Sequence, residues 1–91
     1  MALFDLLGRR WAMRVIWELR EGPMTFRELQ ERCGGISSSV LAQRLAELRE
    51  ARIAGDGNVL TEDGRALLEA YEPLGAWAER WARRNAKKPN G

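Results

Sequence analysis

Hydrophobic and polar positions along this 91-residue chain repeat mainly with the period of an α-helix. Four segments follow that period: residues 9–20, 25–33, 38–51 and 62 to about 84. Residues 53–61 differ, because two short β-prone runs flank an Asp-Gly pair, which is typical of a tight hairpin. We therefore expect a mainly α-helical fold with one small β-hairpin.

The first predicted helix, residues 9–20, is apolar on more than one face. Its apolar residues are Val15, Ile16 and Leu19 on one face and Trp11, Met13 and Trp17 around the rest of the cylinder. A helix with this pattern is buried on more than one side. Two interpretations remain open: a central core helix, or a helix whose second face meets a partner subunit.

Two shorter helices follow in residues 25–52. Thr25 is a natural N-cap, and Glu28 stands at the capping-box spacing. Gly34-Gly35 supplies a turn, because glycine accepts a positive φ at little cost. Ser37 then caps the next helix, whose apolar stripe is Leu41, Leu45 and Leu48. Two amphipathic helices joined by a glycine turn are the layout of a helix-turn-helix.

The opposite face of residues 38–51 is small and polar at its N-terminal end, which suits approach to base edges in the major groove. The alternative is an ordinary solvent-exposed face. The preceding helix and turn favour a DNA-binding face instead. We expect base contacts from Ser38, Ser39 and Gln43, and phosphate contacts from Arg27, Ser37 and Arg49. Arg44 lies nearer the buried stripe, so we interpret it as structural.

The last predicted helix begins after Thr61, which caps it, with Glu62 and Asp63 in the first turn. Its apolar residues repeat at coiled-coil spacing: Leu67, Tyr71, Leu74, Ala78 and Trp81, with Leu68 and Trp77 beside them. Pro73 is expected to kink or split the helix, because proline removes a backbone donor. The polar tail after Asn85 is expected to fray.

Composition restricts the possible chemistry. The chain has one cysteine, no histidine and a net charge of +2, so a structural zinc site and histidine-activated nucleophiles are excluded. We expect no enzyme activity, no cofactor and no metal. Cys33 occupies an apolar helix position, which favours a buried structural thiol over an oxidant sensor. No apolar run reaches the ~20 residues of a membrane span, and the start lacks a signal-peptide pattern, so we expect a cytoplasmic protein.

Several motifs occur in the order of a known family. Leu7-Gly8-Arg9-Arg10-Trp11 resembles "LGxKW", and Gly22-Pro23 with residues 26–29 resembles "GPxRFxEL". Residues 35–48 resemble "GIS…LxxRLxxL", and residues 60–77 resemble "LTxxGxxL…LxxW". The chain is thus similar to the HxlR branch of the MarR-type winged-helix regulators over nearly its whole length.

This resemblance implies a bacterial transcription regulator, most simply a repressor, that binds double-stranded operator DNA as a homodimer. The single domain, 1–91, would comprise a dimer or core helix (1–21), the helix-turn-helix (25–52), a short wing (53–61) and a C-terminal dimer helix (62–85). The first and last helices would form the dimer. The residues expected there are Leu7, Trp11, Leu67, Tyr71, Leu74, Trp77 and Trp81.

Four positions depart from the family pattern. Thr25 stands in place of arginine, Arg52 in place of glycine, and Pro73 one helical turn later than the usual proline. The wing is reduced to a short hairpin with Asp56 at its tip instead of basic residues. Fewer phosphate contacts should lower the affinity for DNA and flatten its salt dependence.

Two other functions remain open. The short acidic wing and the low net charge fit a protein-interaction module that has lost strong DNA binding. A small-molecule effector could instead lie between Trp11, Trp17 and Trp77 at the dimer interface, although core packing explains these tryptophans at least as well.

Overall fold

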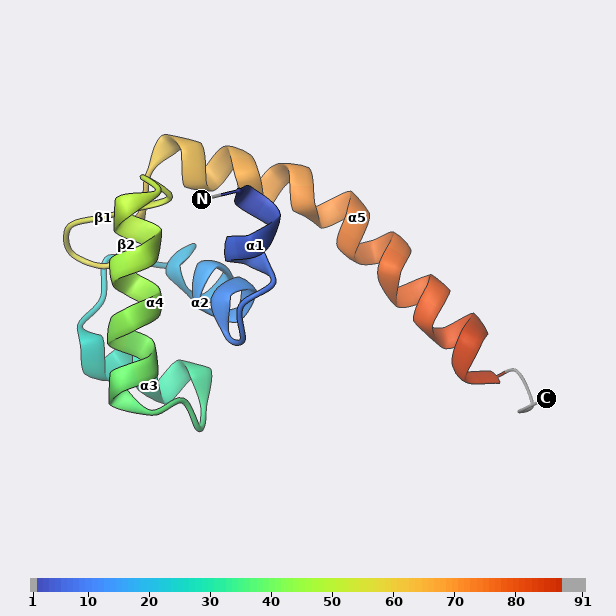
Figure 1. The fold of residues 1–91 in the computed structure, drawn as a ribbon, viewed down its shortest axis with the longest axis horizontal. Helices are drawn as coiled ribbons and strands as arrows, with labels where there is room; N and C mark the ends of the chain where they lie inside the picture. Colours follow the sequence, from blue (N-terminus) through green and yellow to red (C-terminus); the bar gives the residue numbers. More distant parts are fainter. Residues whose placement is uncertain (1, 88–91) are drawn as a thin grey trace.

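The computed structural model describes residues 2–87 and contains five helices and one hairpin among them. The elements are α1 (Leu3–Leu7), α2 (Ala12–Leu19), α3 (Phe26–Cys33), α4 (Ser38–Glu50), β1 (Ala54–Gly55), β2 (Val59–Leu60) and α5 (Glu62–Lys87). Figure 1 shows α1–α4 and the hairpin gathered into one body, with the second half of α5 projecting from it. The described chain measures 48 × 27 × 25 Å. The predicted mainly helical fold with one antiparallel hairpin is confirmed.

The core lies where α1, α2, α3, α4 and the start of α5 meet. Its largest fully buried side chains are Leu6, Val15, Ile16, Leu19, Leu29, Leu41, Leu45 and Leu48. Each buried leucine contributes roughly 1.5–3 kcal/mol relative to an exposed one. Since three of them form the predicted stripe on α4, burying that stripe turns the polar face of α4 outward.

The prediction of one helix over residues 9–20 is wrong at its start. The short helix α1 precedes it, and α2 begins only at Ala12. Between them the Gly8 N–H donates to the Phe4 carbonyl at 2.9 Å, and Trp11 has a left-handed φ of 75°. Such a conformation interrupts a right-handed helix. The helical period of the apolar residues continues across this turn, which is why the pattern alone did not locate it.

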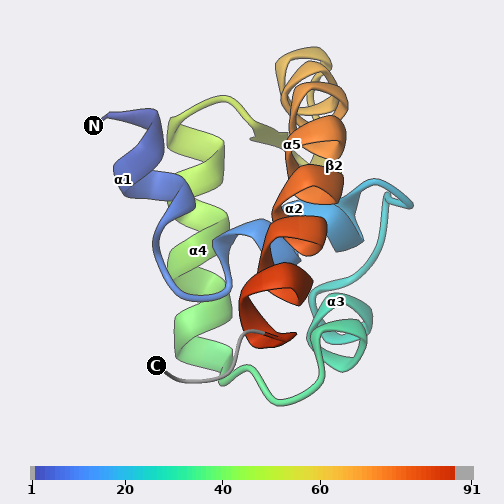
Figure 2. The same ribbon diagram turned by 90° about the vertical axis from the view of Figure 1, so that its right-hand side faces the viewer.

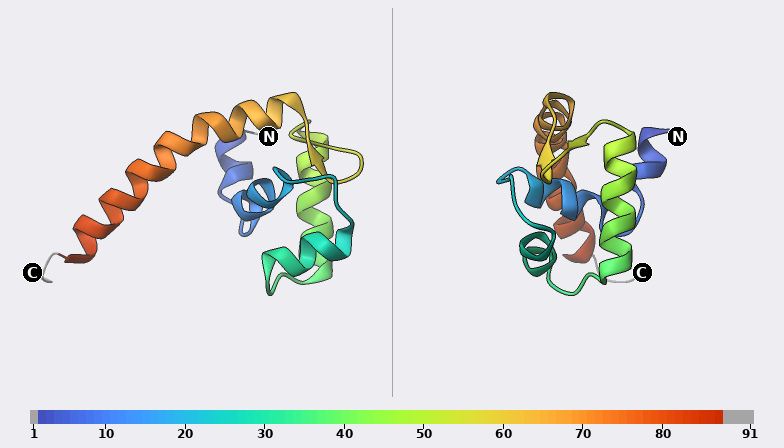
Figure 3. Two further views of the ribbon diagram at one scale, coloured as in Figure 1. Left: turned by 180° about the vertical axis from the view of Figure 1, so that it is seen from behind. Right: turned by 90° about the vertical axis from the view of Figure 1, so that its left-hand side faces the viewer.

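Pro73 does not split the last helix, because α5 runs without interruption from Glu62 to Lys87 (Figure 3). The ring removes the hydrogen bond to the carbonyl of Glu69. Both residues are exposed, so that carbonyl remains open to water and the loss is tolerated. The helix also extends past Asn85; the rest of the tail expected to fray, residues 88–91, lies outside the described residues. Within residues 2–87, no helix is both long and apolar enough to cross a membrane.

The hairpin ties the helix-turn-helix to α5. Strands β1 and β2 pair antiparallel, with Ala54 opposite Leu60. The Thr61 hydroxyl donates to the Ile53 carbonyl at 3.1 Å and accepts the Gly64 N–H at 3.0 Å, which confirms the predicted cap. A Cβ at Gly64 would lie 2.2 Å from the Ile53 carbonyl oxygen. Only glycine therefore allows α5 to begin this close to β1.

Candidate nucleic-acid interface

The start of α3 is fixed by a complete capping box. The Thr25 hydroxyl accepts the Glu28 N–H at 3.0 Å, and a Glu28 carboxylate oxygen accepts the Thr25 N–H at 3.0 Å. These hydrogen bonds hold the pKa of Glu28 below its usual value. At the other end of α3, Gly34 and Gly35 have φ values of 64° and 107°. Both the predicted cap and the predicted glycine turn are confirmed.

The first turn of α4 is tied to α3. The Ser37 hydroxyl accepts the Val40 N–H at 3.2 Å, the N-cap contact that the sequence predicted. In addition, the Gln30 amide donates to the Ile36 carbonyl at 3.2 Å and to the Ser38 hydroxyl at 3.1 Å. Nothing in the sequence pattern indicates this role of Gln30, since a glutamine on a helix surface has no fixed partner. It sets the position of α4 relative to α3.

The outward face of α4 presents small and polar side chains. Exposed along it are Ser38, Ser39, Ala42, Gln43, Ala46, Arg49 and Glu50. Figure 1 places α4 at the opposite end of the body from the projecting half of α5. Serines and alanines on this face leave the helix backbone free to approach a partner closely, and Gln43 offers both a donor and an acceptor.

An arginine–glutamate network fixes the middle of α4 to the turn after α1. The Glu47 carboxylate accepts hydrogen bonds from Arg9 at 2.8 Å and from Arg44 at 3.0 Å. The Arg44 Nε also donates to the Arg10 carbonyl at 2.8 Å. The Arg44 side chain is only 13% exposed. The structural interpretation of Arg44 is therefore confirmed.

The C-terminal end of α4 is held by the hairpin loop. Asn58 Oδ1 accepts a hydrogen bond from Arg49 at 2.7 Å, while Asn58 Nδ2 donates to the Met24 carbonyl at 3.0 Å. The Met24 N–H donates to the Gly57 carbonyl at 3.2 Å. The loop thus folds back onto the segment between α2 and α3, and only its exposed residues, Asp56 and Gly57, face outward.

The residues expected to contact DNA fall into three places. Ser37, Ser38, Ser39 and Gln43 lie together on the first two turns of α4. Arg49 lies about 9 Å beyond Gln43 along the helix axis. Arg27 is on α3, where its side chain is 89% exposed and its nearest carboxylate, Glu31, is 3.7 Å away; such a surface pair restrains it weakly.

The residues expected at a dimer interface are incompletely covered in the single chain. Leu7, Trp11 and Leu67 are half-buried, whereas Tyr71, Leu74, Trp77 and Trp81 are exposed. The three tryptophans considered as walls of an effector site lie in different surroundings. Trp11 borders a hollow beside the start of α4. Trp17 lines a second hollow together with Tyr71, and Trp77 stacks on Trp81 with ring centroids 6.3 Å apart.

Cys33 is buried in the core, as predicted for a structural thiol. Burial raises its pKa, and the nearby carboxylate of Glu18 raises it further. Within residues 2–87, no cluster of three or more histidine, cysteine or carboxylate side chains is arranged to hold a metal.

Comparison with known proteins agrees with this geometry. The family model of the HxlR-like helix-turn-helix matches residues 6–86. The HTH-type transcriptional regulator YodB of Bacillus subtilis is 36% identical over 88 residues, covering 86% of this chain and 79% of YodB. The uncharacterized HTH-type transcriptional regulator MJ0925 of Methanocaldococcus jannaschii is 32% identical, covering 98% of this chain and 89% of that protein.

Two solved structures are similar over most of the fold. The crystal structure of quinone-bound YodB from B. subtilis superposes with a TM-score of 0.77 at 40% identity, covering 85% of this chain and 91% of that one. A possible HxlR family transcriptional factor from Thermoplasma volcanium superposes with a TM-score of 0.75 at 25% identity, covering 91% and 84%. The chain belongs to the HxlR-like helix-turn-helix family and is a DNA-binding transcriptional regulator.

Proposed function

We propose that this regulator reads a specific operator sequence as a homodimer and represses transcription by occluding the promoter. The observation that carries the proposal is the exposed face of α4. The side chains of that face are small and polar over the first two turns. Hydrogen bonds from α3, from the turn after α1 and from the hairpin loop hold α4 in place.

In the proposed complex, the N-terminal turns of α4 enter the major groove. Ser38, Ser39 and Gln43 contact base edges, and Gln43 is suited to a bidentate contact with adenine. Ser37, Arg27 and Arg49 contact phosphates and set the register of the protein on the duplex. Because Ser38 already accepts a hydrogen bond from Gln30, its hydroxyl proton is the part left to donate to a base.

The proposed partner subunit is a second copy that packs on the first and last helices. Leu74, Trp77 and Trp81 are each about half exposed, and large contiguous apolar surfaces on soluble proteins mark interaction sites. Two α4 helices related by a two-fold axis would read two half-sites roughly one helical turn of DNA apart.

The hairpin is proposed to be a shortened wing of the MarR-like type that no longer serves DNA binding. Its three-residue loop is tied back onto Met24, and its exposed tip carries the acidic Asp56. Phosphate contacts then come from α3 and α4 alone, so the salt dependence of binding should be shallow.

One YodB structure is described as quinone-bound and another as diamide-treated. We propose that any effector response here bypasses Cys33, because this thiol is buried and its pKa is raised. We also propose a cytoplasmic location, where the operator is accessible.

The test is fluorescence anisotropy of the purified protein with duplexes from the flanks of its own gene, in a salt series with scrambled competitor. Specific binding that Gln43→Ala weakens by about 1–3 kcal/mol, with relaxed preference at one base pair, supports the proposal. Glu21→Gln, an exposed change in the turn after α2 and outside the residues proposed to contact DNA or the partner subunit, is the control for a distant surface change. Weak binding that is equal for every duplex contradicts the proposal and favours the protein-interaction module.

A further inference from the structure

Gln30 lies on α3, but the end of its side chain reaches the first turn of α4. Its amide nitrogen donates one hydrogen bond to the Ile36 carbonyl at 3.2 Å and a second to the Ser38 hydroxyl at 3.1 Å. Figure 2 shows α3 and the start of α4 joined by the turn at the lower edge of the body. Gln30 is half-buried and Ser38 is exposed. This hydrogen bond therefore links the inside of the helix-turn-helix to the face proposed to read DNA.

The Ile36 carbonyl fixes the direction of the hydrogen bond between Gln30 and Ser38. A carbonyl oxygen only accepts, so the amide of Gln30 has to turn its nitrogen toward Ile36. The second N–H of the same nitrogen then points at Ser38, whose oxygen accepts it. Among residues 2–87, the Ser38 hydroxyl makes no other side-chain hydrogen bond. Its own proton is therefore available on the outer side of α4.

We propose that Gln30 determines which bases Ser38 recognises, an inference that rests on the proposed reading of an operator by α4. Gln30 is a positioning residue, because it makes no base contact itself and acts by holding Ser38 as a donor. Ser38 then favours a base whose major-groove edge offers a carbonyl oxygen, which is O6 of guanine or O4 of thymine. It disfavours cytosine, whose major-groove edge offers only the N4 amino donor.

Ser39 lacks this constraint, although it lies on the same turn of α4. Its oxygen is 3.4 Å from the Ser37 oxygen, and either hydroxyl can donate in that pair. Ser37 also accepts the Val40 N–H at 3.2 Å, which does not decide where the Ser37 proton points. Ser39 is therefore able to donate to a base or to accept from one. A preference for one class of base is expected at Ser38 and not at Ser39.

The start of α4 favours the same class of base. Ser38 is the first residue of the helix, and the N-terminal end of a helix carries a positive partial charge. A carbonyl oxygen is stabilised there, whereas an amino group is not. The helix dipole acts on the whole first turn alike, so the hydrogen bond from Gln30 is what distinguishes Ser38 from Ser39.

Replacing the donor by an acceptor tests the proposal. In Gln30→Glu a carboxylate takes the place of the amide, so the Ser38 hydroxyl donates inward and turns its lone pairs toward the DNA. The preference should shift from guanine or thymine toward cytosine or adenine by about fivefold in relative affinity, the effect of one hydrogen bond. Gln30→Met has a similar length and no donor, so the hydroxyl rotates freely and the preference should disappear.

The probe is the duplex from the flanks of the gene that the wild type binds, prepared with each base pair replaced in turn by the other three. Fluorescence anisotropy gives the relative affinity of each duplex for each variant, and circular dichroism checks that the variants are folded. The base pair read by Ser38 is the one at which Ser38→Ala removes discrimination. In the Ser38→Ala background, Gln30→Met should change the preference at no position, because both changes act through one hydroxyl.

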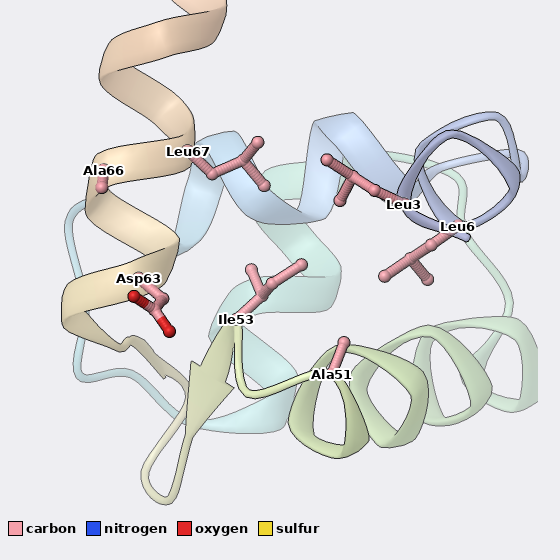
Figure 4. Close-up of a pocket in the computed structure, with 7 residues that line it drawn as sticks. All are labelled: Leu3, Leu6, Ala51, Ile53, Asp63, Ala66 and Leu67. Atoms are coloured by element: carbon pink, nitrogen blue, oxygen red, sulfur yellow. The ribbon is translucent and has the colours of Figure 1, made fainter. Parts of the chain in front are cut away.

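Two control variants separate this effect from a change in charge and from general loosening of α4. Arg32→Gln, also on α3, lowers the net charge by one, as Gln30→Glu does. Ile53→Val removes one carbon at the hollow beside the C-terminal end of α4 (Figure 4). That end is about 18 Å along the helix axis from Ser38. Both controls should lower the affinity for all duplexes alike, if they change it, and should leave the preference unchanged.

The outcomes separate the inference from the proposed function. Wild-type binding that is weak and equal for every duplex overturns both. Reading by α4 stands but the role of Gln30 is overturned if Ser38→Ala removes discrimination at no position, or if the position that it identifies prefers cytosine in the wild type. Gln30 variants that keep the wild-type preference, or that only lose affinity for all duplexes equally, overturn it as well. A shifted preference in Gln30→Glu and a lost preference in Gln30→Met support the inference.

Discussion

Asn58 makes the contacts that join the hairpin loop to the rest of the body. Replacing it separates two contributions to stability, the side-chain hydrogen bonds and the left-handed backbone. Its side chain is nearly buried, at 8% exposure, and both ends of its amide are hydrogen-bonded, to Arg49 and to the Met24 carbonyl. Its backbone has a left-handed φ of 56°. Asn58→Gly removes the side-chain contacts in a residue that adopts this φ freely, whereas Asn58→Ala removes the same contacts and keeps a Cβ in the left-handed region, which alanine tolerates less well than asparagine.

The magnitudes follow from these contacts. Each of the two hydrogen bonds contributes about 1 kcal/mol net, so Asn58→Gly should lower the free energy of unfolding by about 2 kcal/mol. Alanine in the left-handed region costs about 1 kcal/mol more, so Asn58→Ala should lose about 3 kcal/mol. For a domain of this size, each kcal/mol corresponds to a shift in Tm of roughly 4–8 °C.

The assay is urea unfolding followed by circular dichroism at one fixed protein concentration, because association would shift the apparent stability. Asp56→Ala, an exposed change in the same loop, is the matched control and should stay within about 0.5 kcal/mol of wild type. An Asn58→Gly variant as stable as wild type refutes the assigned hydrogen bonds. Equal losses for Asn58→Gly and Asn58→Ala refute the backbone strain.

Three further predictions test other parts of the fold. Gly64→Ala should destabilise the protein by about 1–3 kcal/mol in the same urea assay, because its Cβ would overlap the Ile53 carbonyl; an unchanged midpoint contradicts this packing. The lowered pKa of Glu28 means that its stabilisation is complete at neutral pH and is lost as the pH falls through that lowered value. The free energies of unfolding of wild type and Glu28→Gln should therefore converge as the pH is lowered. A constant difference between them would show that the cap is insensitive to pH. Native Cys33 should react with a thiol reagent much more slowly than in urea, and equal rates would show that the thiol is accessible.

The helix-turn-helix was predictable from sequence because its determinants are local. Thr25 and Glu28 cap each other three residues apart, Gly34 and Gly35 adopt the positive φ that glycine favours, and Ser37 caps the next helix. The leucine stripe of α4 then fixes which face is buried. Each of these features depends on residues within one or two helical turns, so the pattern contains the information needed.

The ties that position α4 depend on contacts distant in sequence, and the pattern could not supply them. Arg9 and Glu47 are 38 positions apart, and Met24 and Asn58 are 34 apart. The same turn that brings Arg9 to α4 requires the left-handed Trp11, which is why the boundary between α1 and α2 was predicted wrongly. Of the candidate site, the exposed serines and Gln43 were found, but Gln30 and Asn58, which hold their helix, were not.

The interface residues fall into two groups, according to whether their loss should change the affinity for all DNA or the preference for one sequence. Glu47 bonds to Arg9 and Arg44 and to none of the residues proposed to contact DNA, whereas Gln30 and Asn58 bond to Ser38 and Arg49. Removing Glu47 therefore loosens the helix against every sequence alike, and affinity then falls without a change in preference. Removing Gln43 leaves the helix in place and deletes a single base contact, so preference changes at one base pair. Reduced preference in a Glu47 variant would mean that α4 is held by its own packing and that the contacts of Glu47 serve the operator directly.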